Sequence, residues 1–401
     1  MSPGYYSRIP TLIRANRQQA IDGSTTVSSL TSITSSVLQG KVEDGRVYAV
    51  YGKEEYGMPM DEAELDRIDM AHAKYYALLE KKRFLAPIGD NPQRVLDLGC
   101  GTGIWSIDFA DMFPTADVIG VDIAPTQPEW VPPNCRFELD DMEARWTWKE
   151  NSFDYIFSRD LILAIRDWPK LVDQVYTHLK PGGWVEFQCV TGVVKCDDAS
   201  LPPDSMLREF SKAINQSTAA FGTPVDDPAR WRGWFEDCGF EEVTEVIYKL
   251  PMNPWPKDQR LKLVGAFEME NLLYGLSGMV TRLFAKTLNW TPEQVEVFLA
   301  GVRKELKNRS VHTYWPFYIV YARKPGGRPT GSAPPLAPAE PTASPDAGTS
   351  PVPASSPVSA SSPAGPASPR RMSPTPVNQP KPEPVLEPVP DPRLEPAHGS
   401  K

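Results

Sequence analysis

The sequence predicts an α/β fold, in which a mostly parallel sheet is covered by helices. Three observations support this prediction. Short apolar runs alternate with longer amphipathic segments between residues 94 and 190, which is the pattern of strand–helix units. A glycine-rich turn at residues 99–103 directly follows the first apolar run. Acidic residues end three successive runs, at the sheet edge where ligands bind in open α/β folds.

A helix is expected before the sheet. Residues 60–84 begin with Asp61 and Glu64, which form a capping pair, and then repeat bulky groups at the spacing of one helix face. Seven strands follow from the apolar runs, with helices over about 102–112 and 168–179. The expected strands cover residues 94–99, 117–123, 135–140, 153–159, 184–190, 241–250 and 314–324.

Two helical segments interrupt the later strands, at about 200–221 and 257–309. Because they leave and rejoin the sheet near its ligand edge, we expect them to form a lid over the site. Several large side chains of this region either line an acceptor pocket or belong to the core, and the sequence leaves both readings open. These are Trp255, Phe267, Met269, Tyr274 and Trp315.

The folded region is expected to span residues 45–324, with disordered segments at 1–44 and 325–401. Of the 43 prolines, 22 fall in the last segment, which contains no Phe, Trp, Tyr or Ile. Such a segment buries too little apolar surface to offset the entropy of ordering it. The first segment is similar, with a Ser/Thr-rich run at 24–36.

Charge and composition exclude several classes of function. The net charge is −9 and lies outside the balanced tail, so no basic footprint for nucleic acid is expected. No apolar run of 18 residues predicts a membrane span. The five cysteines show no metal-binding spacing, which indicates reduced thiols and no metal site. We expect an intracellular protein of the cytoplasm or nucleus.

The glycine-rich turn fits two kinds of cofactor, a dinucleotide or S-adenosylmethionine. Dinucleotide-binding turns space their glycines as G-x-G-x-x-G, so that a pyrophosphate rests on the helix N-terminus. Here Gly99, Gly101 and Gly103 alternate, and Asp97 precedes them. A carboxylate at this position opposes a pyrophosphate but suits an ammonium and a sulfonium. The spacing therefore favours S-adenosylmethionine over a nicotinamide cofactor.

Two further acidic strand ends strengthen this interpretation. Asp122 ends the second strand, where a carboxylate can accept hydrogen bonds from both ribose hydroxyls. Asp140 and Asp141 end the third, where a side chain can accept from the adenine amine while Met142 packs on its ring. Each acid alone fits a solvated strand end equally well, but three in register point to one ligand.

The stretches "LDLGCGTGIWSIDFADMFPTADVIGVDIAPTQPEWVPPNCRFELDD" and "LKPGGWVEFQ" resemble the class I methyltransferases. The similarity is specifically to the fungal LaeA-like branch involved in secondary metabolism, and it covers roughly residues 47–325. The stretch "QPEWVPPN", residues 127–134, is the most specific to that branch. The resemblance implies a Rossmann-like methyltransferase fold with a seven-stranded, mostly parallel sheet and helical lid insertions.

The resemblance also implies how the cofactor is held. The methionine half of S-adenosylmethionine would contact the turn, the ribose the second strand end and the adenine the third, with the sulfonium facing the fourth strand. The residues concerned are Asp97, Gly99, Gly101 and Gly103, then Asp122, then Asp141 with Met142, and finally Ser158.

The sequence does not single out one catalytic residue. Methyl transfer starts from an activated donor, so alignment of the acceptor supplies much of the acceleration, and a base is needed only where a proton must leave. Arg159 and Asp160 are candidates because they follow the fourth strand, although they also fit a buried ion pair. His72 fits a base or a cofactor-covering core residue, and His312 precedes the last strand.

We expect an enzyme that transfers a methyl group from S-adenosylmethionine to an oxygen or nitrogen atom of a small secondary metabolite. The alternative implied by the resemblance is a nuclear regulator of secondary metabolism that binds S-adenosylmethionine and velvet-type protein partners. An intact cofactor loop fits both, whereas an apolar lid pocket favours the enzyme.

Overall fold

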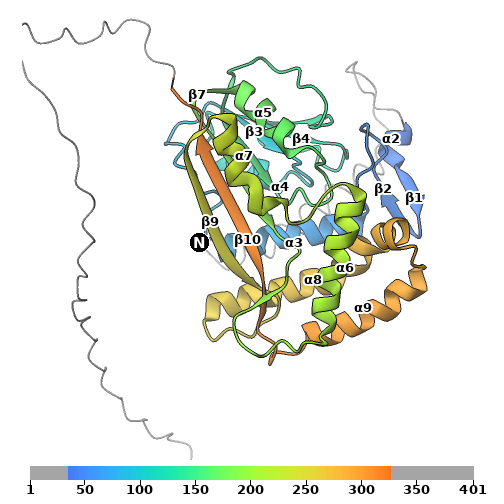
Figure 1. Ribbon diagram of the computed structural model, residues 1–401. Helices are drawn as coiled ribbons and strands as arrows, with labels where there is room; N and C mark the ends of the chain where they lie inside the picture. The colour runs from blue at the N-terminus through green and yellow to red at the C-terminus, as the bar shows by residue number, and fades with distance from the viewer. Residues whose placement is uncertain (1–34, 327–401) are drawn as a thin grey trace, which may run out of the picture. The chain divides into compact units, whose positions relative to one another are not determined.

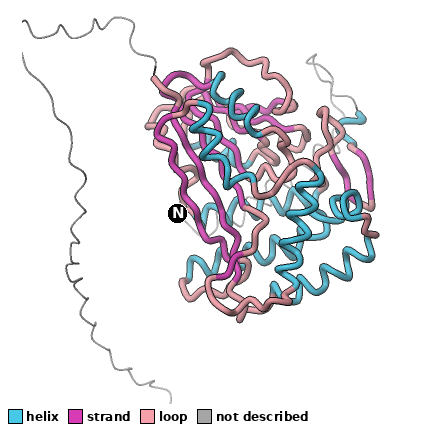
Figure 2. Tube along the Cα trace, viewed as in Figure 1, coloured by secondary structure: helices cyan, strands magenta, loops and turns pink. Residues whose placement is uncertain are grey.

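The computed structural model describes residues 35–326, so most of the expected N-terminal arm and tail lies outside the described residues. A twisted sheet runs through the folded region and is flanked by helices on both faces (Figure 1). A group of longer helices gathers beyond one end of the long strands at 241–251 and 313–323, as the colouring by secondary structure shows (Figure 2).

All seven expected strands are present in the central sheet. Its order is β5–β4–β3–β6–β7–β10–β9, with parallel pairing from β5 to β7 and antiparallel pairing of β10 with both of its long neighbours. A two-residue strand, β8, also pairs with the start of β10. The bounds are β3 Arg94–Leu98, β4 Asp117–Asp122, β5 Cys135–Leu139, β6 Phe153–Arg159, β7 Leu179–Val190, β8 Lys195–Cys196, β9 Glu241–Pro251 and β10 Thr313–Arg323.

The helices divide into two sheet-covering sets and a group at the site. They are α3 Glu62–Leu78, α4 Ile104–Met112, α5 Trp168–His178, α6 Met206–Phe221, α7 Trp231–Cys238, α8 Gln259–Leu288 and α9 Pro292–Leu306, with a 3-10 turn at Asp227–Arg230. Helix α3 begins as expected, since the Asp61 carboxylate accepts a hydrogen bond from the Glu64 backbone N–H.

Alternation along the strands places one apolar set on each face of the sheet. On one face Tyr155 and Phe157 pack against Trp105 and Phe109 of α4, with the Trp105 and Phe157 rings stacked at 3.8 Å. On the other face Ile156 belongs to the cluster formed with α5 and α7. A third cluster joins α3, α6, α8 and α9 to the ends of β9 and β10.

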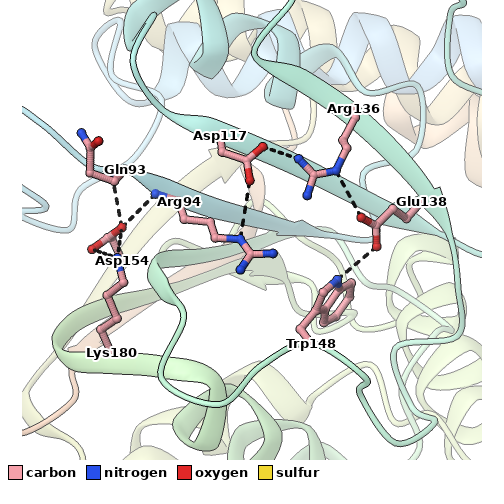
Figure 3. A network of polar contacts seen from close by, with 8 residues as sticks. All are labelled: Gln93, Arg94, Asp117, Arg136, Glu138, Trp148, Asp154 and Lys180. Carbon is pink, nitrogen blue, oxygen red and sulfur yellow. Dashed lines mark hydrogen bonds and ion pairs between the residues drawn. The ribbon is translucent and has the colours of Figure 1, made fainter.

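A polar network ties together the amino ends of the parallel strands (Figure 3). Asp154 accepts hydrogen bonds from the backbone N–H of Arg94 at 2.8 Å and from Lys180 Nζ at 2.8 Å. Asp117 pairs with Arg94 and Arg136 across β3, β4 and β5. This network lies at the edge of the sheet where the parallel strands begin, opposite the edge where they end.

Two expectations about local structure need correction. Part of the expected disordered arm 1–44 forms helix α2 (Ser35–Gln39) and strand β1 (Lys41–Glu43), which pairs with β2 (Arg46–Tyr48). Ion pairs Arg46–Asp61 and Glu43–Arg282 fasten this hairpin to α3 and α8, and local composition does not reveal such pairs. Strand β7 begins at Leu179, five residues early, and passes through the Gly182–Gly183 pair as a bulge.

Within residues 35–326, none of the helices combines the length and apolar character that crossing a membrane requires.

Candidate active site

A cavity opens at the carboxyl ends of β3, β4, β5 and β6, beneath α3, α6 and α8 and the segment 52–58. Most residues predicted for the site border it: Asp97, Gly99, Gly101, Asp122, Asp141, Met142, Arg159, Asp160 and His72. Three others do not border it, namely Gly103, Ser158 and His312.

Glycine is required in the turn by conformation and by packing. Gly99 has φ +66°, and a Cβ atom there would overlap Leu161 Cδ2. Gly103 has φ +77° and caps α4, and a Cβ atom there would lie 2.7 Å from Phe137 Cε1. Gly103 therefore shapes the turn against Phe137 and does not face the ligand space.

Asp97 is a buried carboxylate in the cavity wall, 2% exposed. Ser106 Oγ donates a hydrogen bond to it at 2.6 Å. Burial raises the pKa of Asp97 to about 7, although the Ser106 hydrogen bond and the charge of Arg159 act in the opposite direction. Asp97 forms no ion pair with the residues that the structure describes, so a cationic ligand group fits this position.

Asp122 and Asp141 hold the backbone around the mouth of the cavity. Asp122 accepts hydrogen bonds from the N–H groups of Gly101 at 2.8 Å and Ala124 at 2.9 Å, and desolvation raises its pKa. Asp141 accepts from the N–H groups of Lys53 at 3.1 Å and Glu143 at 2.9 Å. Both carboxylates border the space where the resemblance places ribose and adenine.

The "QPEWVPPN" stretch supports the same turn from outside. Gln127 Nε2 donates to the carbonyl oxygens of Gly101 at 2.7 Å and Ala124 at 3.0 Å, and Thr126 Oγ1 also donates to Gly101 at 2.9 Å. Asn134 Nδ2 donates to three carbonyl oxygens around the end of α4. This motif thus acts on the cavity through the position of Gly101.

Arg159 and Asp160 do not form the ion pair considered from the sequence, and each binds a different partner among the described residues. Arg159 donates to Gln188 Oε1 at 2.8 Å and to the Arg83 carbonyl at 2.9 Å, which fixes its guanidinium at the cavity wall. Asp160 accepts a hydrogen bond from the Tyr75 phenol and has φ +55°. Ser158 is 1% exposed and lies within the sheet, so it does not reach the cavity.

The histidines have different surroundings. His72 is buried on α3 and lies 3.1 Å from Asp108, and burial lowers its pKa, so its ring is neutral near pH 7. It borders the cavity. His312 lies elsewhere, with Nδ1 2.7 Å from Asp198 and its ring against Trp255. Of these two candidates, His72 borders the cavity and His312 does not.

A buried polar network on α3 and α8 also borders the cavity, and the sequence pattern did not predict it. Lys74 Nζ donates to Glu268 at 2.7 Å, and Asn271 Nδ2 donates to the same carboxylate at 3.0 Å. The Arg67 guanidinium donates one hydrogen bond to Asn271 Oδ1 at 2.7 Å and another to Glu64 Oε1 at 2.6 Å. One feature of the sequence could have predicted this network: Glu64, Arg67 and Lys74 lie three and seven residues apart, on the face of α3 that otherwise carries apolar side chains.

Apolar side chains form the remaining walls beside this network. They are Phe210 and Ile214 of α6, Leu272 and Met279 of α8, Val190, and Trp315 of β10. Of the five lid side chains considered from the sequence, Trp315 borders the cavity, whereas Tyr274 is 75% exposed and Trp255 donates to the Thr313 carbonyl at 2.9 Å.

Comparison with known proteins gives concordant matches. Residues 70–245 match the family model of a methyltransferase domain. Methyltransferase pytC of Aspergillus terreus is 38% identical over 301 residues, which cover 75% of this chain and 93% of the relative. The secondary metabolism regulator LAE1 of Cochliobolus heterostrophus is 37% identical over 290 residues, covering 71% and 94%. The protein-methionine methyltransferase laeA of Emericella nidulans is 34% identical over 307 residues, covering 76% and 82%.

Among solved structures, phosphoethanolamine N-methyltransferase 2 of Haemonchus contortus, in complex with S-adenosyl-L-methionine, aligns with a TM-score of 0.39 at 21% identity, covering 63% of this chain and 52% of that one.

The chain is an S-adenosylmethionine-dependent methyltransferase with the Rossmann-like fold of class I. Within that class it belongs to the fungal family that contains pytC and the LaeA-type proteins. The buried, unpaired carboxylate of Asp97 beside the glycine turn fits the cationic end of this cofactor.

Proposed function

We propose that this methyltransferase acts on an oxygen or nitrogen atom of a small secondary metabolite. The observation that carries the proposal is the part of the cavity wall where α3, α6 and α8 place apolar side chains and a buried polar network. A concave pocket with apolar walls and a few polar groups suits a small molecule. The relative pytC is named a methyltransferase, which supports methyl transfer as the reaction.

Residues at the glycine-rich turn and the neighbouring strand ends can bind the methyl donor, S-adenosylmethionine. We assign Asp97 to the ammonium of the cofactor, Asp122 to its ribose, and Asp141 with Met142 to its adenine. Gly99 and Gly101 provide close backbone approach. When bound, S-adenosylmethionine supplies a methyl group already activated on sulfur, so the protein needs to align the acceptor and exclude water.

Two groups in the cavity can receive a proton from an acceptor. His72 is neutral near pH 7 because burial lowers its pKa, and the Asp160 carboxylate lies where β6 ends. A positioned base contributes roughly 10²- to 10⁴-fold where the acceptor must lose a proton.

The test uses methyl-labelled S-adenosylmethionine, the purified protein and an extract of the source cell, followed by separation into small-molecule and protein fractions. An Asp122→Ala variant serves as control, because it removes charge-assisted hydrogen bonds worth about 1.5–3 kcal/mol. Label in a small molecule, lost in the variant, supports the proposal. Label absent from that fraction refutes it.

The names of the relatives favour a second candidate. Two of them are a secondary metabolism regulator and a protein-methionine methyltransferase. On this alternative the chain regulates secondary metabolism in the nucleus together with velvet-type partners. Label recovered only in protein, and lost with Asp122→Ala, would support it.

A further inference from the structure

The Lys74–Glu268 ion pair lies in an unusual position for two opposite charges. Each side chain is 3% exposed, and the pair joins α3 to α8 across the wall of the cavity. Removing two charges from water costs several kcal/mol per ion, and apolar residues of similar volume usually hold two helices together at least as well. Packing of α3 against α8 therefore does not explain the pair.

The hydrogen-bonding capacity of the pair is only partly used. Lys74 and Asn271 both donate to Glu268 Oε2, whereas Oε1 receives no hydrogen bond from residues 35–326. Lys74 Nζ uses one of its three donors in that bond and lies 4.2 Å from the centre of the Tyr75 ring. One free acceptor and free donors thus stand side by side at the cavity wall.

The charges around the cavity limit what can enter. Nine carboxylate side chains and four Lys or Arg side chains border it. Three of the cations pair with carboxylates, namely Lys74 with Glu268, Arg67 with Glu64 and Arg166 with Glu143. The fourth, Arg159, donates to Gln188 Oε1 and to the Arg83 carbonyl and forms no ion pair with the described residues. Carboxylates still outnumber cations nine to four, so an anionic acceptor would meet an excess of negative charge, whereas an uncharged acceptor would not.

We propose that Lys74 and Glu268 are specificity-determining residues that bind a hydroxyl, phenol or amide group of an uncharged, mainly apolar acceptor. Such a group both donates and accepts, so it matches Glu268 Oε1 and the free donors of Lys74 together. The apolar remainder packs against Phe210, Ile214, Leu272 and Met279. This inference rests on the proposed small-molecule function.

The test replaces the pair and leaves the fold intact. In the double variant Lys74→Met/Glu268→Leu both charges are lost together, so no buried charge is left alone. Lys74→Met/Glu268→Gln is the second variant, since its amide oxygen can still accept from Asn271. The matched control is Lys212→Met/Glu209→Leu, an exposed Lys–Glu pair on α6 with side chains 70% and 48% exposed.

The acceptor probe is source-cell extract, divided before the reaction into a bicarbonate-soluble fraction of carboxylic acids and a neutral fraction of alcohols, phenols and amides. We expect the wild type to label the neutral fraction. Both cavity variants should lose at least about tenfold of that label, the worth of one or two hydrogen bonds to charged groups. Their melting temperature and their affinity for S-adenosylhomocysteine should stay at wild-type values, and the control should change nothing.

Retention of the label by a folded cavity variant would overturn the inference and show that the pair is structural. Label entering chiefly the carboxylic acid fraction would also overturn it. A wild-type protein that labels no small molecule refutes the proposed function itself, and that result is distinguishable because it precedes any comparison of variants.

Discussion

The Tyr75 phenol donates a hydrogen bond to the Asp160 carboxylate and so connects α3 to the turn after β6. Burial first, and then the charge of Asp160, raises the pKa of Tyr75 well above its usual value, which keeps the proton on the phenol. Asp160 has φ +55°, a conformation that Asp and Asn tolerate better than most residues. The hydrogen bond thus fixes a carboxylate in the wall of the cavity.

Replacing Tyr75 with Phe should destabilise the protein by about 1–3 kcal/mol, because the partly buried carboxylate of Asp160 loses its donor. The ring still stacks on Phe317 at 4.7 Å, so packing changes little. Urea unfolding of Tyr75→Phe measures the loss. Tyr274→Phe, at a side chain 75% exposed, is the control and should have no effect. Equal stability of the two variants would show that the hydrogen bond contributes nothing.

Comparing Gly103→Ala with Gly45→Ala separates two costs to stability, that of a side chain on a left-handed backbone and that of its overlap with a neighbour. Both glycines have nearly the same φ, +77° and +75°, but only Gly103 faces another side chain, that of Phe137. Gly45→Ala should cost about 1–2 kcal/mol from the left-handed conformation alone. Gly103→Ala should cost more, and it should also weaken S-adenosylhomocysteine binding because the turn moves. Thermal unfolding and calorimetry measure these effects. The explanation fails if the two variants behave alike.

Asp97 should make stability depend on pH. Its pKa is about 7 when folded and near the ordinary 3.8 when unfolded, so the folded state holds the proton more tightly between these values. The stability contributed by this group is therefore full below pH 3.8 and is lost as the pH rises through about 7. Asp97→Asn should remove this loss.

Urea unfolding of the wild type and Asp97→Asn at about pH 5 and about pH 8 checks the sign. The variant should gain stability relative to the wild type at the higher pH. His72, whose pKa is lowered by burial, acts in the opposite direction, and it cancels because it is present in both proteins. A constant difference between the two proteins at both pH values would contradict the raised pKa.

Gln127→Ala should weaken S-adenosylhomocysteine binding by roughly three- to tenfold, because Gly101 loses a hydrogen bond that positions its peptide. The side chain does not border the cavity, so the effect is transmitted through the turn. Calorimetry measures the affinity. Gln93→Ala, at the amino edge of the sheet, is the control, and a similar change in both variants would point to a general loss of stability.

Local pattern was sufficient to predict the sheet and many of the residues that border the cavity. Strands such as 94–98 and 117–122 carry short apolar runs, and the acids at their ends lie at one edge because the strands are parallel and in register. Gly99 and Gly101 were predicted for the same reason. Gly103 was placed near the ligand by spacing, but its neighbour Phe137 comes from another strand.

The pairing of Lys74 with Glu268 could not be predicted from local pattern. Lys74 and Glu268 are 194 residues apart, and each alone is an ordinary charge on a helix. Their meeting depends on how α8 packs across α3, which is a tertiary event. His312 shows the opposite error, because its position before β10 suggested the site, whereas Asp198 holds it elsewhere.

Helices α8 and α9 leave the sheet after Pro251 and return at Thr313, and Pro251 pairs with Tyr314 across β9 and β10. The inserted segment of residues 252–312 thus begins and ends at neighbouring positions of two paired strands of the sheet. The sequence of this segment can therefore change during evolution while the turn at 99–103 keeps its structure. Divergence in chemical selectivity among relatives would then concentrate in residues 252–312 and their partners on α3, while recognition of the methyl donor stays constant.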